Sequence, residues 1–309
     1  AFPSAPDDLF GLPLDIVTNE AGEVFVADPM SNRIHRFSAS GVHVTSFGQE
    51  GAGPGEFDRL GSLAVGNDLL QVVDRGNGRL QILTPTGEYV GSRSLPPRAD
   101  RSGTYLGSSG EMVVGTRGAG EALVVTYDSS GDSIRAIGEP VAPFIAMWDM
   151  VAMKERARDG EVPDEIRNTV SPQPLEDGGM VLVLAAEGRV RRYDPSGSLA
   201  WDVPLEDPAL EGIRADFVRR NREDSRPFAF FSLNYVDDIV AREDFLWILL
   251  NTPEGVPSLL LRWSDQGTLS QRIVLTNVFG ARRMAFDPSG SRLYLTVPNE
   301  ARVMVCPLN

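Results

Sequence analysis

The chain has 309 residues, 42% of them hydrophobic, with 31 glycines and 22 prolines, which suits one large all-β domain with many turns. Its 29 basic and 43 acidic residues give a net charge of −14, which argues against binding to nucleic acid or to an anionic membrane. No run of 18 apolar residues occurs, so no transmembrane helix is predicted.

The amino terminus and the rarer residue types bear on the origin of the chain. It starts at Ala1 without an initiator methionine or a hydrophobic leader, so we expect a processed protein, periplasmic or extracellular. Lys154 is the only lysine, and we interpret this arginine bias as a sign of a bacterial genome. The single cysteine, Cys306, can form no internal disulfide and is expected to be a buried, small apolar residue.

The first two units of the chain contain the same succession of short strands. Strands are predicted at 15–17, 24–28 and 33–37, and again at 63–65, 70–74 and 79–83. Each unit then reaches a hairpin in which an apolar residue precedes a glycine by four positions. The pattern occurs five times, at Phe37 and Gly41, Leu83 and Gly87, Tyr127 and Gly131, Tyr193 and Gly197, and Trp263 and Gly267.

The spacing of these glycines predicts the fold. Positions 41, 87, 131, 197 and 267 are separated by 46, 44, 66 and 70 residues, and repeats of 40 to 50 residues with several strands are typical of propeller blades. A sixth unit has its turn at 287–290. We therefore predict an all-β, six-bladed propeller that forms a single domain over residues 1–309.

The two longer intervals contain the main departures from the repeat. In the first insertion, about 144–168, Phe144, Met147, Trp148 and Val151 have helical spacing. The second, about 207–231, begins with Asp207-Pro208, a helix-start signal. Its predicted helix has an apolar stripe of Leu210, Ile213 and Phe217, four arginines (Arg214, Arg219, Arg220 and Arg222), and then Phe228, Phe230 and Phe231.

The first two units resemble the NHL repeat. The resemblance rests on an apolar pair followed by Ala27-Asp28, a turn, Arg33-Ile34 and the glycine hairpin, and on the linker 47–57. It covers nearly the whole chain but weakens in units three to five, where Thr116, Ala186 and Asn251 replace Asp28. It implies a six-bladed propeller, and it implies no single activity, because the fold serves lyases, lactonases, scaffolds and ligand binders.

The repeated Asp28 and Asp74 are interpreted as structural. An aspartate at a strand end accepts N–H bonds from the following turn, and its recurrence at the repeat period favours a role in building the blade over a role in catalysis.

Both insertions fall between the last strand of one blade and the first strand of the next, so we expect them on one face, walling the channel entrance. Met147, Trp148, Phe228, Phe230 and Phe231 would supply an apolar wall. Arg214, Arg219, Arg220 and Arg222 would add a positive edge that favours a small anionic ligand or an acidic protein partner. The alternative is that the helices only cover apolar blade surface.

A second candidate site is predicted where the innermost strands begin. Alignment on the turns places Asp15, Asp238 and Arg283 at equivalent positions in three neighbouring blades. We expect an arginine between two carboxylates, either as a latch that neutralises buried charge or as part of a binding site.

Metal-dependent chemistry has little support in the sequence. A zinc site with three histidines is excluded because only His35 and His43 occur, and both are predicted on the surface of blade one. The resemblance to gluconolactonase-type propellers leaves a calcium site open, with Asp15, Asn168 and Asp238 as ligands. No other cofactor is predicted.

The sixth unit ends three residues after Cys306, so blade six is predicted to lack a fourth strand of its own, with the missing strand upstream of Ala1. Phe2 and Phe10 are expected to repeat the linker positions of Phe47 and Phe57.

These observations favour a binding or interaction module, an exported propeller that engages a ligand or a protein partner at its insertion-covered face. It could be an accessory subunit of a larger complex outside the cytoplasm, with peripheral association to a membrane complex. The alternative is a calcium-dependent hydrolase or lyase acting in the channel.

Overall fold

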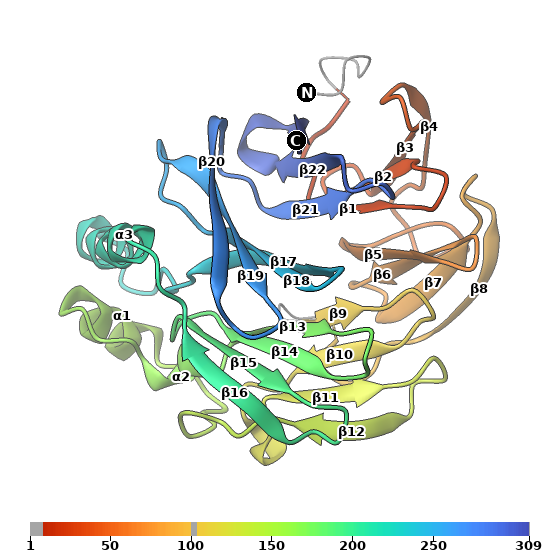
Figure 1. Cartoon of the computed structure of the whole chain (residues 1–309). Helices are drawn as coiled ribbons and strands as arrows, with labels where there is room; N and C mark the ends of the chain where they lie inside the picture. Colours follow the sequence, from red (N-terminus) through yellow and green to blue (C-terminus); the bar gives the residue numbers. More distant parts are fainter. Residues whose placement is uncertain (1–8, 100–103, 309) are drawn as a thin grey trace. The chain divides into compact units, whose positions relative to one another are not determined.

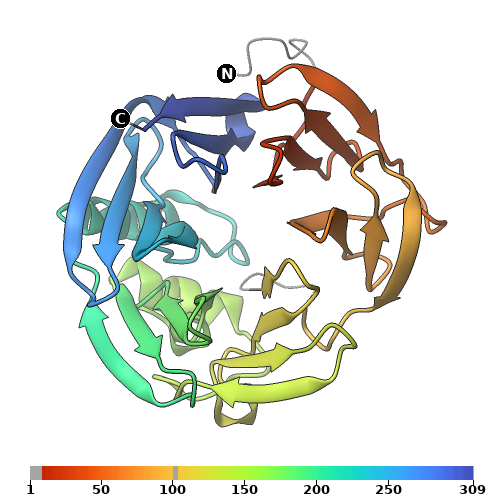
Figure 2. The same ribbon diagram turned by 45° about the vertical axis from the view of Figure 1, so that its right-hand side comes forward.

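The computed structural model describes residues 9–99 and 104–308, in which 23 strands form six antiparallel sheets (Figure 1). The expectation for Phe2 lies outside these residues. The first sheet contains β1 (Asp15–Thr18), β2 (Val24–Asp28), β3 (Arg33–Phe37) and β4 (His43–Phe47). The second contains β5 (Leu60–Gly66), β6 (Leu69–Asp74), β7 (Arg79–Leu83) and β8 (Tyr89–Ser94). Figure 2 shows each strand of the first sheet, in red to orange, beside its neighbour in sequence.

The next three sheets repeat this order. They contain β9 (Thr104–Leu106), β10 (Met112–Gly115), β11 (Val124–Tyr127) and β12 (Ser133–Ile137); β13 (Val170–Pro174), β14 (Met180–Leu184), β15 (Arg189–Tyr193) and β16 (Leu199–Pro204); and β17 (Val236–Arg242), β18 (Phe245–Leu250), β19 (Pro257–Ser264) and β20 (Leu269–Phe279). Short 3₁₀ turns occur at Ala119–Glu121 and Pro298–Glu300.

The sixth sheet has three strands among the described residues: β21 (Arg283–Phe286), β22 (Arg292–Val297) and β23 (Arg302–Pro307). The described part of the chain thus shows no fourth strand after β23, as predicted. Cys306 in β23 is only half-buried, so the expectation of full burial is wrong. Its neighbour on β22 is the fully buried Leu293.

The chain divides into two compact units, and the division passes through the third sheet. The first unit comprises Ala1–Met112, Tyr127–Ser133 and Gly280–Asn309, and the second comprises Val113–Thr126 and Ile134–Phe279. In the first unit β1 packs beside both β5 and β21, and in the second β13 packs beside β17. Within each unit, therefore, the first strand of one sheet adjoins the first strand of another.

The five predicted glycine hairpins join the third and fourth strands of the first five sheets. Gly41 and Gly87, for example, have φ angles of 81° and 92°, a region that costs glycine little. In each hairpin the glycine N–H donates to the carbonyl three residues earlier, over 2.8 Å from Gly41 to Ser38. The repeat is therefore specified by local turn chemistry.

Asp28 and Asp74 have the structural role expected of them. Asp28 is fully buried and accepts N–H bonds from Gly11, Leu12 and Met30 over 2.6 to 3.0 Å. Asp74, also fully buried, accepts the N–H of Asp58 and a 2.8 Å bond from the Arg79 guanidinium.

His35 corrects the prediction of two surface histidines. It lies on β3 and is only 2% exposed, because the inner and outer faces of this middle strand are both covered. Its Nδ1 lies 2.8 Å from Ser46 Oγ, which also bonds to the half-buried His43. The edge of the Phe10 ring packs against the His35 imidazole.

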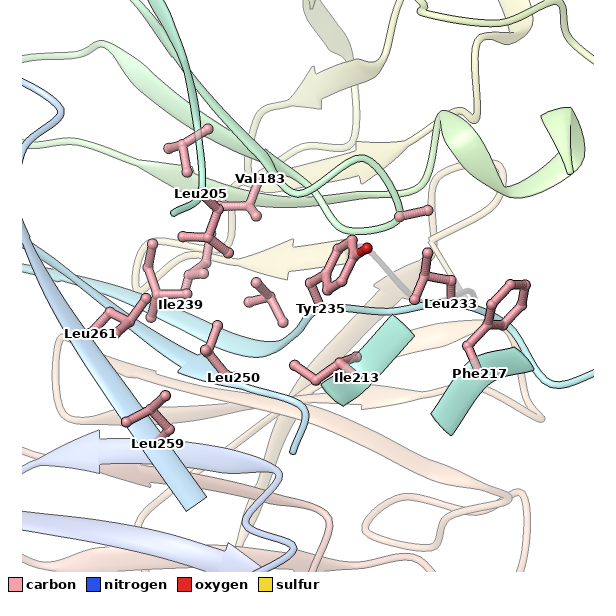
Figure 3. Close-up of a cluster of buried hydrophobic side chains, with 14 of the residues drawn as sticks. Val183, Leu205, Ile213, Phe217, Leu233, Tyr235, Ile239, Leu250, Leu259 and Leu261 are labelled. Carbon is pink, nitrogen blue, oxygen red and sulfur yellow. The ribbon is translucent and has the colours of Figure 1, made fainter. Parts of the chain in front are cut away.

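Three helices lie in the second unit: α1 (Met150–Arg158), α2 (Asp164–Arg167) and α3 (Ala209–Glu223). No helix among the described residues is long and apolar enough to cross a membrane. As predicted, Ile213 and Phe217 of α3 are buried, and Figure 3 shows them near Leu233 and Tyr235. Met153, Ala157 and Ile166 join the same core.

The first insertion contains less helix than its apolar spacing suggests. Asp149 caps α1 by accepting the N–H groups of Val151 and Ala152 over 3.1 and 3.0 Å, so the helix begins at Met150. Phe144, Met147 and Trp148 precede it in irregular backbone and form no helical stripe.

Candidate functional site

The two insertions meet in the second unit, where α1 and α3 lie side by side. Arg214 donates to the Gly160 carbonyl over 2.7 Å, Arg158 to that of Asn221 over 3.0 Å, and Arg222 to that of Arg158 over 2.6 Å. Gly160 thus lies beside Arg214, whereas Arg158 lies beside Asn221 and Arg222. Residue numbers rise in opposite directions along the two segments, so the segments run antiparallel. This confirms the expected contact between the insertions, and we call α1 and α3 the helix pair.

The buried side chain of Lys154 links α1 to the segment that follows α3. Its side chain is 2% exposed, and its ammonium group lies 3.2 Å from an Asp224 carboxylate oxygen and donates to the Arg226 carbonyl over 2.6 Å. A bond from the Arg226 guanidinium, together with that of Lys154, holds the pKa of Asp224 well below its ordinary value. The carboxylate of Asp224 therefore stays ionised at physiological pH.

Large apolar side chains are exposed in the segments that flank the helix pair. Met147 is 87% exposed and Phe228 is 75% exposed, whereas Trp148 is about one-third exposed and has the Arg117 guanidinium 4.6 Å from its ring centre. Phe230 and Phe231 are half-buried, since Phe230 packs against Phe217 and Arg220 stacks on Phe231 at 4.1 Å. The residues of the predicted apolar wall thus differ in exposure: Met147, Trp148 and Phe228 are exposed, whereas Phe230 and Phe231 are half-buried.

The four predicted arginines of α3 are exposed, and each has a partner within the unit. Arg219 pairs with Asp216 and with Glu223, which raises the pKa of its guanidinium. Arg214 and Arg222 bond to the carbonyls of the first insertion, and Arg220 stacks on Phe231. Much of their hydrogen-bonding capacity is therefore used to hold the helix pair together.

A shallow hollow of about 690 Å³ follows the outer face of α3. It is lined by two small or apolar residues, Ala215 and Val218, and by the charged residues Glu211, Arg214, Arg219, Arg222 and Glu223. Its charges are mixed, so the hollow offers both apolar surface and hydrogen-bonding groups to a partner.

At the start of the inner strands, the structure brings together two of the three residues predicted there. Arg283 Nε lies 3.9 Å from Asp15 Oδ1, and Asp15 Oδ2 accepts the Leu63 N–H over 2.7 Å. Burial raises the pKa of Asp15, although Arg283 and the Leu63 N–H oppose that rise. Asp238 belongs to β17 in the second unit, where it pairs with Leu249, and its approach to the other two stays a prediction.

Among the described residues, no group of three or more histidine, cysteine, aspartate or glutamate side chains could hold a metal ion. The calcium set of Asp15, Asn168 and Asp238 spans both units and stays a prediction. Asn168 is buried. Its amide oxygen accepts the N–H groups of Val141 and Ala142, and its amide nitrogen donates to the Arg117 and Ala142 carbonyls. Asn168 therefore anchors the first insertion.

Sequence reasoning missed the roles of Lys154 and Asn221. Lys154 attracts notice in the sequence only as the sole lysine, yet its buried side chain links α1 to Asp224. Asn221, fully buried at the end of α3, exchanges two bonds with the backbone of Phe231. The one available signal was that the only lysine of an arginine-rich chain stands inside an insertion.

Comparison with known proteins identifies the fold. A family model described as a 6-bladed beta-propeller, DUF5128, matches residues 9–101. The peptidylglycine alpha-amidating monooxygenases of Rattus norvegicus and Mus musculus are 42% and 41% identical over 97 residues, which is 28% of this chain and 10% of theirs. The chain thus spans about a tenth of the length of these curated relatives.

Solved structures of varied function are similar over most of the chain. The virginiamycin B lyase of Staphylococcus aureus has a TM-score of 0.52 at 13% identity, covering 96% of this chain and 84% of that one. Hydrazine synthase of Kuenenia stuttgartiensis gives 0.53 at 14%, covering 99% and 79%, and the RRP9 WD40 repeats give 0.56 at 15%, covering 96% and 95%. The chain is a six-bladed β-propeller, and likeness at this level of identity shows the fold alone.

Proposed function

We propose that this propeller is a binding or interaction module of the NHL-like type, exported by a bacterium, and that the outer surface of its helix pair recognises a protein partner or a ligand. The observation that carries the proposal is the exposure of Met147, just before α1, and of Phe228, in the segment after α3, although the inner faces of both helices are packed in the core. Large exposed apolar side chains beside arginines are typical of recognition surfaces.

The helix pair also serves as structural cover. Met153, Ala157, Ile213 and Phe217 complete the core of the second unit, which requires helices there whether or not they bind anything. Cover alone does not account for Met147 and Phe228, whose side chains are 87% and 75% exposed and lie outside the buried core of the unit. The buried Lys154–Asp224 pair keeps that surface rigid, which lowers the entropy lost on binding.

Blocking the helix pair tests the proposal. In a Cys306→Ser background, the exposed Ala215 on α3 is replaced by cysteine and coupled to a polyethylene glycol maleimide. The matched control carries the same label at Gln271→Cys, on exposed β20. Partners are captured from extracts of the native host by chemical cross-linking and identified by mass spectrometry.

We expect the label at position 215 to abolish capture of a partner that the unlabelled chain and the Gln271→Cys conjugate both retain. Equal capture by the two conjugates would overturn the proposal, and so would the absence of any partner specific to the unlabelled chain.

A further inference from the structure

Two histidines and a serine connect the third and fourth strands of the first sheet. His35 lies on β3, and Ser46 Oγ on β4 is 2.8 Å from both His35 Nδ1 and the Nε2 of His43, also on β4. On the other side of its ring, His35 Nε2 lies 3.7 Å from Asp28 Oδ2 on β2. The buried Asp28 is thus connected through His35 and Ser46 to the half-buried His43. We call His35, Ser46 and His43 the histidine bridge.

The second sheet has amide, hydroxyl and phenol groups at the three equivalent positions. In the order of the histidine bridge, the strand register gives these as Gln81, Ser92 and Tyr89. Gln81 donates to Asp74 over 3.2 Å, and the Tyr89 hydroxyl lies 2.9 Å from Ser92 Oγ. The two sheets are therefore built alike, but only the first has imidazoles at these positions.

The two sheets also differ in the cation beside their buried aspartate. In the second sheet the Arg79 guanidinium lies 2.8 Å from Asp74. Its counterpart in the first sheet, Arg33, is exposed and forms no ion pair with Asp28 in the described part of the chain. The His35 ring is instead the basic group that meets Asp28, whose pKa of about 2 keeps its carboxylate ionised.

The other groups around the histidine bridge supply no second carboxylate. The rings of Phe10 and Phe37 pack edge-on against the two imidazoles, and their apolar cluster also contains the phenol of Tyr294 on β22. Arg36, which points to the opposite face of β3, pairs with Glu23. A second positive ring in the bridge would therefore meet no further counter-charge among the described residues.

The histidine bridge has room for one added proton. Ser46 has a single hydroxyl hydrogen, so it can accept from one imidazole and donate to the other. With a proton on His35, the His35 Nδ1–H donates to Ser46, and the Ser46 hydroxyl donates to the neutral His43. A second proton, on His43, removes that acceptor and puts two positive rings 6.2 Å apart. Burial, and then the charge of His35, lower the pKa of His43 below its ordinary value.

We propose that the histidine bridge is an acid-sensitive latch, which holds β4 against β3 near neutral pH and releases β4 when His43 takes up a proton. This inference is independent of the proposed function. When β4 opens, His43 reaches water and titrates at its ordinary pKa of 6.5, so the open strand binds protons more readily than the closed one. The contribution of the latch is therefore present above about pH 6.5 and is lost as the pH falls below it. Asp28 stays ionised throughout this range.

Hydrogen exchange followed by mass spectrometry tests the proposal on the full chain. Protection of β4 is compared at pH 7.5 and 5.0, after correction for intrinsic exchange rates, in the wild type, His43→Gln and Ser46→Ala. Tyr89→Gln, at the equivalent position on β8, is the matched control. Because the chain has only two histidines, NMR of the imidazole signals follows the titration of His43 directly. Thermal unfolding checks that each variant is folded.

We expect β4 protection in the wild type to fall by about five- to thirtyfold between pH 7.5 and 5.0, because a group with a pKa of 6.5 in the open strand favours opening by at most about thirtyfold at pH 5.0. Protection of β8 should change by less than about twofold. His43→Gln should abolish the fall in β4, whereas Tyr89→Gln should retain it. Ser46→Ala should lower β4 protection already at pH 7.5.

Four outcomes would overturn the inference. They are β4 protection that does not depend on pH, a fall that persists in His43→Gln, an equal fall in β8, and titration of His43 at or above pH 6.5.

Discussion

At the scale of single residues, buried carboxylates hold the blades together. Burial alone would raise the pKa of Asp28, but the nearby His35 ring and the N–H groups of Gly11, Leu12 and Met30 outweigh it and hold the pKa at about 2. The repeat period predicted a structural role for Asp28. It could not show His35 beside it, because strand alternation does not report burial on both faces of a sheet.

Asp28→Asn should lower the free energy of unfolding by about 2 kcal/mol at pH 7. The folded-state pKa lies below the ordinary 3.8, so the wild-type contribution is present above pH 4 and is lost as the pH falls towards 2. Urea denaturation from pH 2.5 to 7 should therefore show a shallower pH dependence in the variant. Asp68→Asn, at an exposed turn residue with φ of 56°, is the control, and an equal loss there would contradict the prediction.

Arg283→Met should destabilise the first unit by about 1 to 2 kcal/mol at pH 7. Without Arg283 the pKa of the half-buried Asp15 rises further, so its ionisation costs more in the folded state. Since protonation removes that cost, the loss should shrink as the pH falls towards 4. Denaturation at both pH values measures it, with the exposed Arg59→Met as control. A loss that does not change with pH would show that Asp15 is well solvated.

At the scale of elements, helical periodicity predicted the buried face of the helix pair but not the residues that begin the first insertion. The stripe of Ile213 and Phe217 follows from helical periodicity, because packing against a sheet demands it. The same periodicity misled at Phe144 to Trp148, where capping by Asp149 starts the helix six residues later. The pairing of Lys154 with Asp224 joins residues 70 apart in the chain and leaves no local pattern.

Two methionines of the first insertion give a matched comparison. Met153→Ala should lower the free energy of unfolding by about 2 to 4 kcal/mol, because Met153 is 0% exposed in the core of the second unit. Met147→Ala should change it by less than about 0.5 kcal/mol. Chemical denaturation distinguishes them. Similar losses for both would mean that Met147 is packed in solution.

At the scale of the whole molecule, six repeats were predictable because each depends on a local turn and a few apolar positions. Contacts between sheets were harder to predict from the sequence. The bond from Leu63 to Asp15 joins consecutive blades of the first unit, and only the alignment of equivalent strand positions hinted at it. The sequence placed the candidate surface in the insertions. It could not distinguish the exposed Met147 and Phe228 from the half-buried Phe230 and Phe231, since burial depends on tertiary packing.

The net charge of −14 predicts a salt effect on the whole chain. Raising NaCl from 10 to 200 mM should increase the melting temperature by about 2 to 5 °C, because screening reduces the repulsion between acidic groups. Scanning calorimetry measures the change. The exposed Glu20, Glu88 and Glu254 can be replaced together by glutamine. Salt should raise the melting temperature of this variant by less than that of the wild type, and a larger increase would contradict this explanation.

The solitary lysine makes the helix pair observable by chemistry. Apart from the α-amine, Lys154 carries the sole primary amine of the chain, and its burial against Asp224 shields it from acylating reagents and from proteases specific for lysine. A succinimidyl ester should therefore modify Lys154 only when the pair separates. The rate of that modification, followed by mass spectrometry of the intact protein, would report helix opening without any label being introduced, and a bound partner should slow it.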